Sequence, residues 1–154
     1  MDRIAVFPGS FDPITRGHES VVIRALDLFD KIIIAVGVNS NKSGFFPLEK
    51  RMGWIKKTFS AYGKVEVLYY EGLTTDLCKQ QNARFILRGI RTSADFEYER
   101  SIAQMNKALM SNLETVFILT TPELAPISST ILRDIYKHDG DIKPFVPEKI
   151  NSDL

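Results

Sequence analysis

The sequence predicts an α/β protein, with a doubly wound, mostly parallel sheet of five strands in a single domain over residues 1–154. Short apolar runs, typical of strands buried on both faces, alternate with segments whose apolar residues recur at helical spacing. This alternation continues along the chain without an internal repeat, a low-complexity segment or a linker. A chain of 154 residues, 44% hydrophobic and 25% charged, has the size and composition of one globular domain with a substantial core.

The first half of the chain contains three predicted strands and three predicted helices. Residues 31–38 are almost entirely apolar and rich in β-branched side chains, as in a parallel strand covered on both faces. Pro47 is suited to open a helix, in which Leu48, Met52 and Ile55 repeat at helical spacing. In order, we expect a strand at 3–8, a helix at 17–29, a strand at 31–38, a helix after Pro47, a strand at 65–70 and a helix to about Gln81 capped by Thr74 or Thr75.

The second half continues the same order. A strand at 85–87 is expected to end in a loop at 88–92, and the longest helix follows at about 94–113. The last strand, at 115–119, precedes a loop with two prolines. A final helix begins at Ser128 or Ser129 and ends near His138, because Asp139-Gly140 favours a stop. The turn-rich tail at 143–148 is expected to add one more helical turn.

Polar residues follow the ends of the predicted strands. In a doubly wound sheet, ligands bind at the carboxyl ends of the strands, where the strand order switches. Residues that fall at this edge therefore converge in space although the sequence scatters them. They are Ser10 and His18 after the first strand, Lys42 after the second, Arg88, Gly89 and Arg91 after the fourth, and Ile127, Ser128, Ser129 and Thr130 after the fifth.

The loop from Gly9 to His18 has the features of an anion site at a helix start. Gly9 allows a sharp turn or close approach, and Thr15 can cap the helix that follows. His18 then falls in the first turn, where free N–H groups and the helix dipole favour a phosphate. The alternative is an ordinary turn followed by a surface histidine.

The other candidate residues also have ordinary explanations. Asp95, Glu99, Ile102 and Asn106 share one helix face, which can bind adenosine or ribose, orient Arg91, or simply be solvated. Two arginines beside Gly89 suit two phosphates, but solvated loop arginines are also common. Three consecutive hydroxyls at 128–130 exceed what a plain cap needs. We assign no chemistry to His138, and we interpret Trp54, Tyr62, Tyr69 and Tyr70 as packing residues.

The overall composition excludes several classes of protein. A formal net charge of +1 provides no global field for nucleic acid or an anionic membrane. The single cysteine, Cys78, cannot form an internal disulfide, and no Cys/His set has zinc-ligand spacing. The sequence has no P-loop, no Gly-x-Gly-x-x-Gly loop and no nucleophile elbow. The apolar run near Met1 is too short for a signal peptide, so we expect a cytoplasmic protein.

Three segments, in order, resemble a known enzyme family. Residues 9–18 resemble the first signature of the nucleotidylyltransferase superfamily, in a Thr-x-Gly-His version, and residues 127–133 resemble its second signature. Between them, Arg88-Gly89-Ile90-Arg91 followed by Asp95-Phe96-Glu97-Tyr98-Glu99 is similar to the bacterial phosphopantetheine adenylyltransferases. One departure is Ser10, where many members have threonine, although the hydroxyl is kept. The resemblance covers essentially the whole chain.

The resemblance implies a Rossmann-like nucleotidylyltransferase fold and a reaction of ATP with 4′-phosphopantetheine to give dephospho-CoA and pyrophosphate. It implies Mg²⁺ supplied with ATP, a homohexamer, and CoA as a feedback ligand. Catalytic roles would fall to Ser10, His18, Lys42 and Arg91. Phosphopantetheine would bind Ser10, Lys42, Thr74, Arg88 and Asn106. ATP would bind Ser10, Phe11, His18, Gly89, Ile90, Arg91, Glu99, Leu124, Ala125, Pro126, Ile127, Ser128, Ser129 and Thr130.

Two alternatives remain at this stage. One is another small nucleotidylyltransferase, acting on nicotinamide mononucleotide or on a phosphorylated alcohol, which the Arg88–Glu99 region disfavours. The other is a regulatory nucleotide-binding domain without catalysis, which a missing His18 or Lys42 would favour. Both residues are present.

Overall fold

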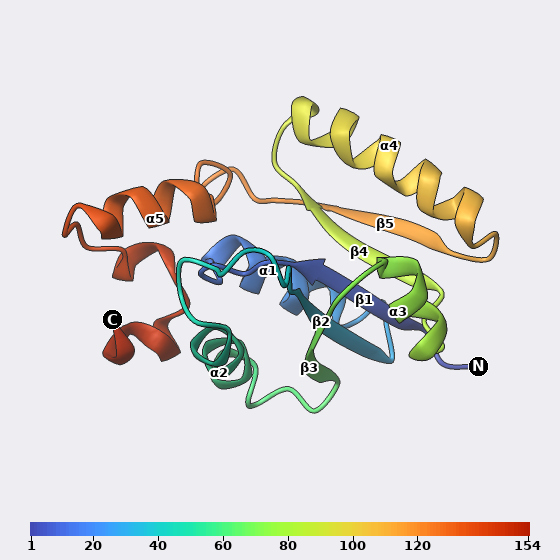
Figure 1. The fold of residues 1–154 in the computed structure, drawn as a ribbon, viewed down its shortest axis with the longest axis horizontal. Coiled ribbons are helices and arrows are strands. Elements are labelled where there is room, and N and C mark those ends of the chain that lie inside the picture. The colour runs from blue at the N-terminus through green and yellow to red at the C-terminus, as the bar shows by residue number, and fades with distance from the viewer.

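The computed structural model describes residues 1–154 and contains one five-stranded sheet with the strand order β3-β2-β1-β4-β5 (Figure 1). Every strand pair is parallel, which confirms the predicted doubly wound sheet. The strands are β1 (Ile4–Gly9), β2 (Lys31–Gly37), β3 (Val65–Tyr70), β4 (Phe85–Ile90) and β5 (Glu114–Leu119). The order reverses between β1 and β4, so the predicted ligand edge lies at the carboxyl ends of these two strands.

Five α-helices connect and follow the strands, and two short 3₁₀ helices complete the chain. They are α1 (Arg16–Ala25), α2 (Leu48–Thr58), α3 (Thr74–Gln80), α4 (Ser93–Leu109), α5 (Ser129–Lys137), η1 (Lys143–Phe145) and η2 (Glu148–Asp153). None of the helices combines the length and the apolar composition that a membrane span requires.

Several predicted boundaries were wrong, for local reasons. Helix α4 ends at Leu109 rather than near 113, because Met110 adopts an extended backbone. Strand β4 continues to Ile90, so Arg88 belongs to a strand and not to a loop. Neither Thr74 nor Thr75 caps α3; its N-cap is Leu73, and the Thr74 hydroxyl instead lies 2.8 Å from the Tyr70 hydroxyl.

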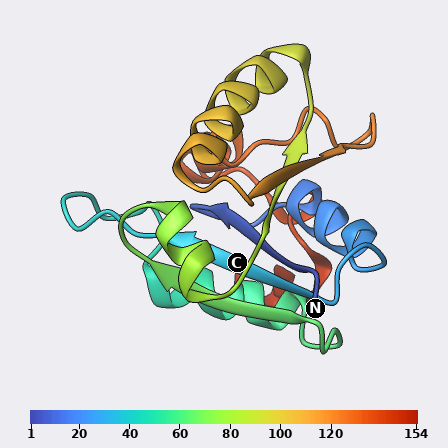
Figure 2. The same ribbon diagram turned by 90° about the vertical axis from the view of Figure 1, so that its right-hand side faces the viewer.

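Apolar side chains alternate between the two faces of the sheet and build a core on each. Helices α1 and α2 pack on one face, where Val22 and Ile55 join Ile32 and Ile34 of β2. Helix α3 packs on the opposite face, together with the neighbouring strand residue Ile33. Figure 2 shows α4 lying over the β4–β5 side of the sheet, apart from α1 and α2.

Two sequence interpretations concern single side chains. Cys78 is fully buried in the α3 core, and burial raises the pKa of its thiol to about 11, which agrees with a small inert hydrophobe. Trp54 is buried as predicted, but Tyr69 is 61% exposed on the edge strand β3, so its assignment to packing was wrong.

The central strands separate toward their carboxyl ends. Strand β1 pairs with β2 over six residues, through to Gly9 opposite Val36. It pairs with β4 at only two positions, the last being Val6 opposite Ile86. Beyond this point the β1–β4 ladder stops, and a gap opens between them at the switch point of the sheet.

Candidate active site

A cavity of about 390 Å³ lies at the carboxyl ends of β1 and β4. Four separate segments line it: the loop between β1 and α1, the end of β4, the first turns of α4, and the start of α5. Many of the residues predicted to form a nucleotide site lie in this lining, namely Ser10, Phe11, His18, Arg88, Gly89, Arg91, Glu99, Ile127, Ser128, Ser129 and Thr130. The predicted convergence at the sheet edge is therefore present in the structure for these residues.

A second cavity of about 280 Å³ adjoins the first on the other side of Arg88. It contains Thr74 and Asn106, the two remaining residues predicted to bind the second substrate apart from Lys42. Pro8, Gly9, Arg88 and Glu99 line both cavities, so they form a shared wall. The gap between β1 and β4 thus holds two compartments that meet at one arginine.

Some predicted site residues are not part of either lining. Ile90 is buried in the core, at 7% exposure. Leu124, Ala125 and Pro126 precede the α5 residues that line the first cavity but are not among its lining residues. Lys42 lies in the exposed loop at 39–46, where its backbone N–H donates to the carbonyl of Asn39 at 3.0 Å. The side chain of Lys42 lines neither cavity.

His18 is held at the start of α1 by a reciprocal cap with Thr15. The backbone N–H of His18 donates to the Thr15 hydroxyl at 3.2 Å, and the Thr15 N–H donates to His18 Nδ1 at 3.0 Å. Because Nδ1 accepts this bond, the proton of the neutral ring resides on Nε2. The cap therefore fixes the tautomer that presents an N–H donor at the ring's other end.

The surroundings of His18 keep its ring neutral. Burial, followed by the nearby guanidinium groups of Arg88 and Arg91, lowers its pKa from 6.5 to about 4. The ring of Phe11 lies 4.9 Å from the imidazole, and Phe7 lies 6.2 Å away. At neutral pH the side chain is consequently a neutral hydrogen-bond donor and not a cation.

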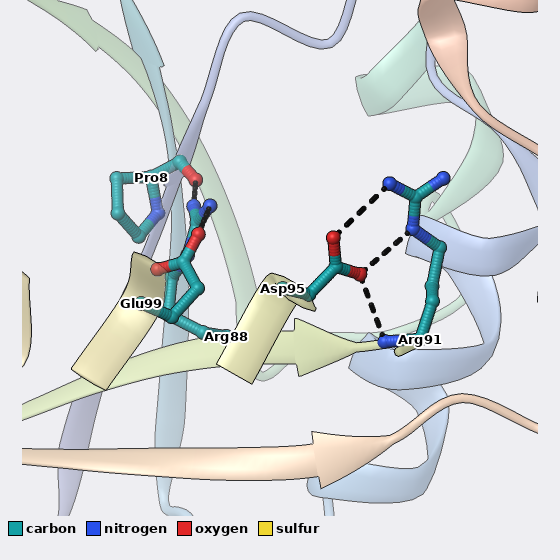
Figure 3. Close-up of polar contacts among 5 residues, drawn as sticks. All are labelled: Pro8, Arg88, Arg91, Asp95 and Glu99. Carbon is teal, nitrogen blue, oxygen red and sulfur yellow. Dashed lines mark hydrogen bonds and ion pairs between the residues drawn. The ribbon is translucent and has the colours of Figure 1, made fainter. Parts of the chain in front are cut away.

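Arg88 occupies the wall between the cavities and is fixed by three hydrogen bonds (Figure 3). Its Nε and Nη2 donate to the two carboxylate oxygens of Glu99 at 2.9 and 2.6 Å, a bidentate pair. Its Nη1 donates to the Pro8 carbonyl at 2.5 Å, across the gap where the β1–β4 ladder has ended. Glu99, predicted to bind ATP, thus holds Arg88 in this structure and is itself only 8% exposed.

Arg91 is oriented by a carboxylate one turn into α4, as considered from the sequence. The Asp95 carboxylate accepts from the Arg91 backbone N–H at 3.0 Å and from its Nε at 3.1 Å (Figure 3). These bonds outweigh the effect of burial and hold the pKa of Asp95 below its usual range. Asp95 and Glu99, one turn apart on α4, therefore position one arginine each.

The hydroxyls at the start of α5 have separate partners. Ser128 caps the helix by accepting from the Ile131 N–H at 3.2 Å. Ser129 donates to the Pro13 carbonyl at 2.8 Å, and Thr130 accepts from Arg133 at 3.2 Å. The surplus of hydroxyls inferred from the sequence is thus used partly to join α5 to the first loop.

Sequence reasoning missed a buried ion pair behind the first loop. Asp12 and Arg51 are only 6% and 5% exposed, and neither lines a cavity. In the sequence Asp12 precedes a proline and indicates only a turn, and Arg51 stands among charged residues of α2 that resemble a solvated face. No local pattern distinguishes Arg51 from Lys50 or Lys56, so only the folded chain identifies it.

The carboxylates in the cavities do not form a metal cage. No group of three or more His, Cys, Asp or Glu side chains is placed to hold a metal ion. The two acidic residues in the lining, Asp95 and Glu99, are each already paired with an arginine. A cation bound mainly by protein side chains does not fit this donor set, whereas a cation that arrives on a nucleotide's phosphates needs no such cage.

The arrangement as a whole suits two phosphate-bearing molecules that meet at Arg88. The site offers two arginines, a neutral imidazole donor and a helix start, and it contains no Ser, Cys or Lys placed beside a general base. Such a site aligns reactants and stabilises charge on phosphate oxygens without forming a covalent intermediate.

Comparison with known proteins agrees with this geometry. Residues 6–135 match the family model described as cytidylyltransferase-like. A protein of Cytophaga hutchinsonii named phosphopantetheine adenylyltransferase is 51% identical to this chain, over 97% of this chain and 100% of the relative. The counterpart in Flavobacterium johnsoniae is 52% identical over 96% of this chain and 97% of the relative.

The solved structures support the same fold at lower identity. A bifunctional NMN adenylyltransferase/ADP ribose pyrophosphatase from Francisella tularensis aligns with a TM-score of 0.69 at 20% identity, over 95% of this chain but only 45% of that protein. The second form of that protein, complexed with AMP and a Mn ion, aligns with a TM-score of 0.70. The motifs, the two-cavity site and the near-complete matches lead to one conclusion: the chain belongs to the phosphopantetheine adenylyltransferase family.

Proposed function

We propose that the protein transfers the adenylyl group of ATP to 4′-phosphopantetheine, giving dephospho-CoA and pyrophosphate, a step in coenzyme A biosynthesis. The observation that supports this best is the pair of cavities sharing Arg88 in the gap between β1 and β4. ATP would occupy the larger cavity, with its phosphates near His18, Arg91 and the start of α5. The phosphate of phosphopantetheine would reach Arg88 from the smaller cavity, beside Thr74 and Asn106.

The transfer is a direct displacement between two phosphates. An oxygen of the phosphopantetheine phosphate forms a bond to the α-phosphorus of ATP, and the bond between that phosphorus and the bridging oxygen of pyrophosphate breaks. The attacking group is already an anion, so no protein base is required. His18 Nε2–H and Arg91 stabilise the negative charge that builds on the α-phosphate oxygens.

Lys42 is proposed as an additional cation for this transition state. Its loop joins β2 to α2 and residues 39–43 are exposed, so Lys42 reaches the phosphates only when this part of the loop moves toward the first cavity. The roles of Leu124, Ala125, Pro126 and Ile90 in ATP binding are proposed from the family resemblance alone, because none of these residues lines the cavity.

Three other properties are proposed from the chemistry of the substrates. ATP is expected to enter as its Mg²⁺ complex, which is then part of the substrate. CoA, which shares the phosphopantetheine moiety, is expected to compete for the smaller cavity. Both substrates are intracellular metabolites, so we place the protein in the cytoplasm.

A homohexamer is proposed from an uncovered surface of α4. Tyr98, Ile102, Met105 and Leu109 recur at helical spacing and are exposed by 69%, 39%, 65% and 55%. A stripe of this kind on a single chain is typical of an interface. Sedimentation velocity of the full chain and of Met105→Glu tests it: we expect a hexamer that dissociates in the variant, and a wild-type monomer would refute the proposal.

The function is tested by pyrophosphate release from ATP with a panel of acceptors: 4′-phosphopantetheine, nicotinamide mononucleotide and a simple phosphorylated alcohol. We expect release with phosphopantetheine only, lowered by about three orders of magnitude in His18→Ala with ATP affinity little changed. His138→Ala is the matched control, because His138 lies at the exposed end of α5, and it should retain full activity. Release with another acceptor, or none with phosphopantetheine, would reject the proposal.

A further inference from the structure

The buried Asp12–Arg51 pair joins two loops that carry proposed catalytic residues. Asp12 lies in the first loop, two residues after Ser10, and Arg51 lies in the first turn of α2. Their side chains approach to 4.0 Å, between Arg51 Nε and Asp12 Oδ1. Both are almost completely removed from solvent, and neither contacts the two cavities. A buried charge pair is costly to desolvate, so a gain other than substrate contact is needed to explain it.

The hydrogen bonds of the pair show what it connects. The Asp12 carboxylate accepts from the backbone N–H of Phe45 at 2.7 Å and of Phe46 at 2.9 Å. Arg51 donates from Nε to the Phe46 carbonyl at 3.0 Å. It also donates from Nη1 to the Ser10 carbonyl at 2.8 Å. Asp12, from the first loop, thus holds the second loop through two hydrogen bonds, and Arg51, from α2, donates one hydrogen bond to each loop.

The space around the pair leaves the second loop little freedom at this anchor. A Cβ added to Gly44 would lie 2.8 Å from Arg51 Nη2 and 3.0 Å from Asp12 Oδ2, so the chain here passes directly against the ion pair. Phe46 is 4% exposed and packs edge-on against Trp54, with the ring centroids 4.9 Å apart. Residues 44–46 are thus fixed both by hydrogen bonds and by close packing.

Lys42 is only three residues from this anchor. Three residues of extended chain span at most about 11 Å, so the anchor at Phe45 limits where Lys42 can travel. At its other end the loop is tethered by the bridge between Asn39 and Lys42. The anchor and the bridge together therefore limit the positions that Lys42 can take relative to the first loop.

We propose that Asp12 and Arg51 are positioning residues. They fix the position of the Lys42 loop relative to the Ser10 loop, so that both loops act on the same α-phosphate. The proposal rests on the function proposed above. It assigns no substrate contact to either residue. It predicts that loss of the pair lowers turnover through Lys42 while the ATP cavity keeps its affinity.

The test is a double-mutant cycle between Asp12→Asn and Lys42→Ala, with kcat, KM and ATP dissociation constants measured for each protein. We expect Asp12→Asn alone to lower kcat at least tenfold and to change ATP affinity less than threefold. Lys42→Ala should then lower kcat by a much smaller factor in the Asp12→Asn background than in the wild type, because Lys42 is already misplaced there. Arg51→Lys is the second variant should Asp12→Asn fail to fold. It keeps the positive charge but loses the guanidinium group, whose separate N–H groups donate to the two loops.

Thr58→Val is the matched control. Thr58 is also buried on α2 and loses one hydrogen bond, to the Trp54 carbonyl at 2.7 Å, but it lies outside the pair. It should destabilise the fold while leaving kcat and the full effect of Lys42→Ala unchanged. Additive effects of Asp12→Asn and Lys42→Ala would overturn the proposal, since a purely structural role predicts additivity.

Hydrogen exchange separates this proposal from the proposed function. The amides of Phe45 and Phe46 should exchange at least tenfold faster in Asp12→Asn, and not in Thr58→Val, whatever the protein catalyses. Unchanged exchange would overturn the proposal. If the wild type releases no pyrophosphate, the proposed function fails, and exchange alone then decides whether Asp12 anchors the loop.

Discussion

The neutral state of His18 has a measurable consequence for stability. In the folded protein its pKa is about 4, whereas in the unfolded chain it takes its ordinary value near 6.5. As the pH falls through 6.5, the unfolded chain binds a proton that the folded protein does not, so the folded state loses stability until the pH reaches about 4. At 1.36 kcal/mol per pH unit the full difference is at most about 3 kcal/mol, because the ring is partly exposed.

Between pH 7 and pH 5 this linkage amounts to about 2 kcal/mol at most. Urea unfolding at these two pH values, at one protein concentration, measures it in the wild type and in His18→Gln. Carboxylates titrate in both proteins, so the wild type should lose more stability than the variant on acidification by up to this amount. His138→Gln is the control and should behave like the wild type. An equal loss in wild type and His18→Gln would refute the assignment of a neutral His18 in the folded protein.

Three further predictions follow from contacts in the site. Glu99→Gln removes the charge that holds Arg88, and we expect at least a tenfold rise in the KM for phosphopantetheine with a smaller change for ATP; equal changes for both substrates would contradict it. Thr15→Val removes the cap of α1 and should lower the free energy of unfolding by about 1 kcal/mol in urea titrations; an unchanged value would show that the cap is not formed. Gly44→Ala places a methyl group against Arg51 and should lower the free energy of unfolding by about 1–3 kcal/mol in urea titrations. Gly53→Ala, in open space on α2, is the control and should not be destabilising.

The sheet and most of the cavity lining could be predicted from the sequence because both depend on local patterns. Runs such as 31–38 are buried on both faces and show it in their composition. Once the strands are known, the rule that parallel strands end at one edge brings His18, Arg88 and Ser128 together. Element ends were less predictable: α4 stops at Leu109, where Met110 leaves the helical backbone, although the only sequence signal there is the turn-favouring pair Ser111-Asn112.

The supporting contacts of the site could not be predicted, because they join residues far apart in sequence. Arg51 contacts Ser10, 41 residues away, and Arg133 donates to the Asp12 carbonyl, 121 residues away. Glu99 was predicted to bind nucleotide, and only the structure shows its two oxygens on Arg88. The position of Lys42 outside both cavities likewise depends on the conformation of a loop, which residue types alone do not determine.

Because the β1–β4 ladder ends early, the sheet consists of two parts that are joined by little backbone hydrogen bonding. One part is β3-β2-β1 and the other is β4-β5. The backbone pairing that joins them covers only two residue pairs, at Ala5 and Val6. Arg88 adds one side-chain bond across the opening, to the Pro8 carbonyl. A ligand lying in this opening would contact both parts of the sheet at once, and its contacts would stabilise their association. Bound nucleotide should therefore raise resistance to unfolding most strongly along the β1–β4 seam, where amides should show the largest gain in hydrogen-exchange protection.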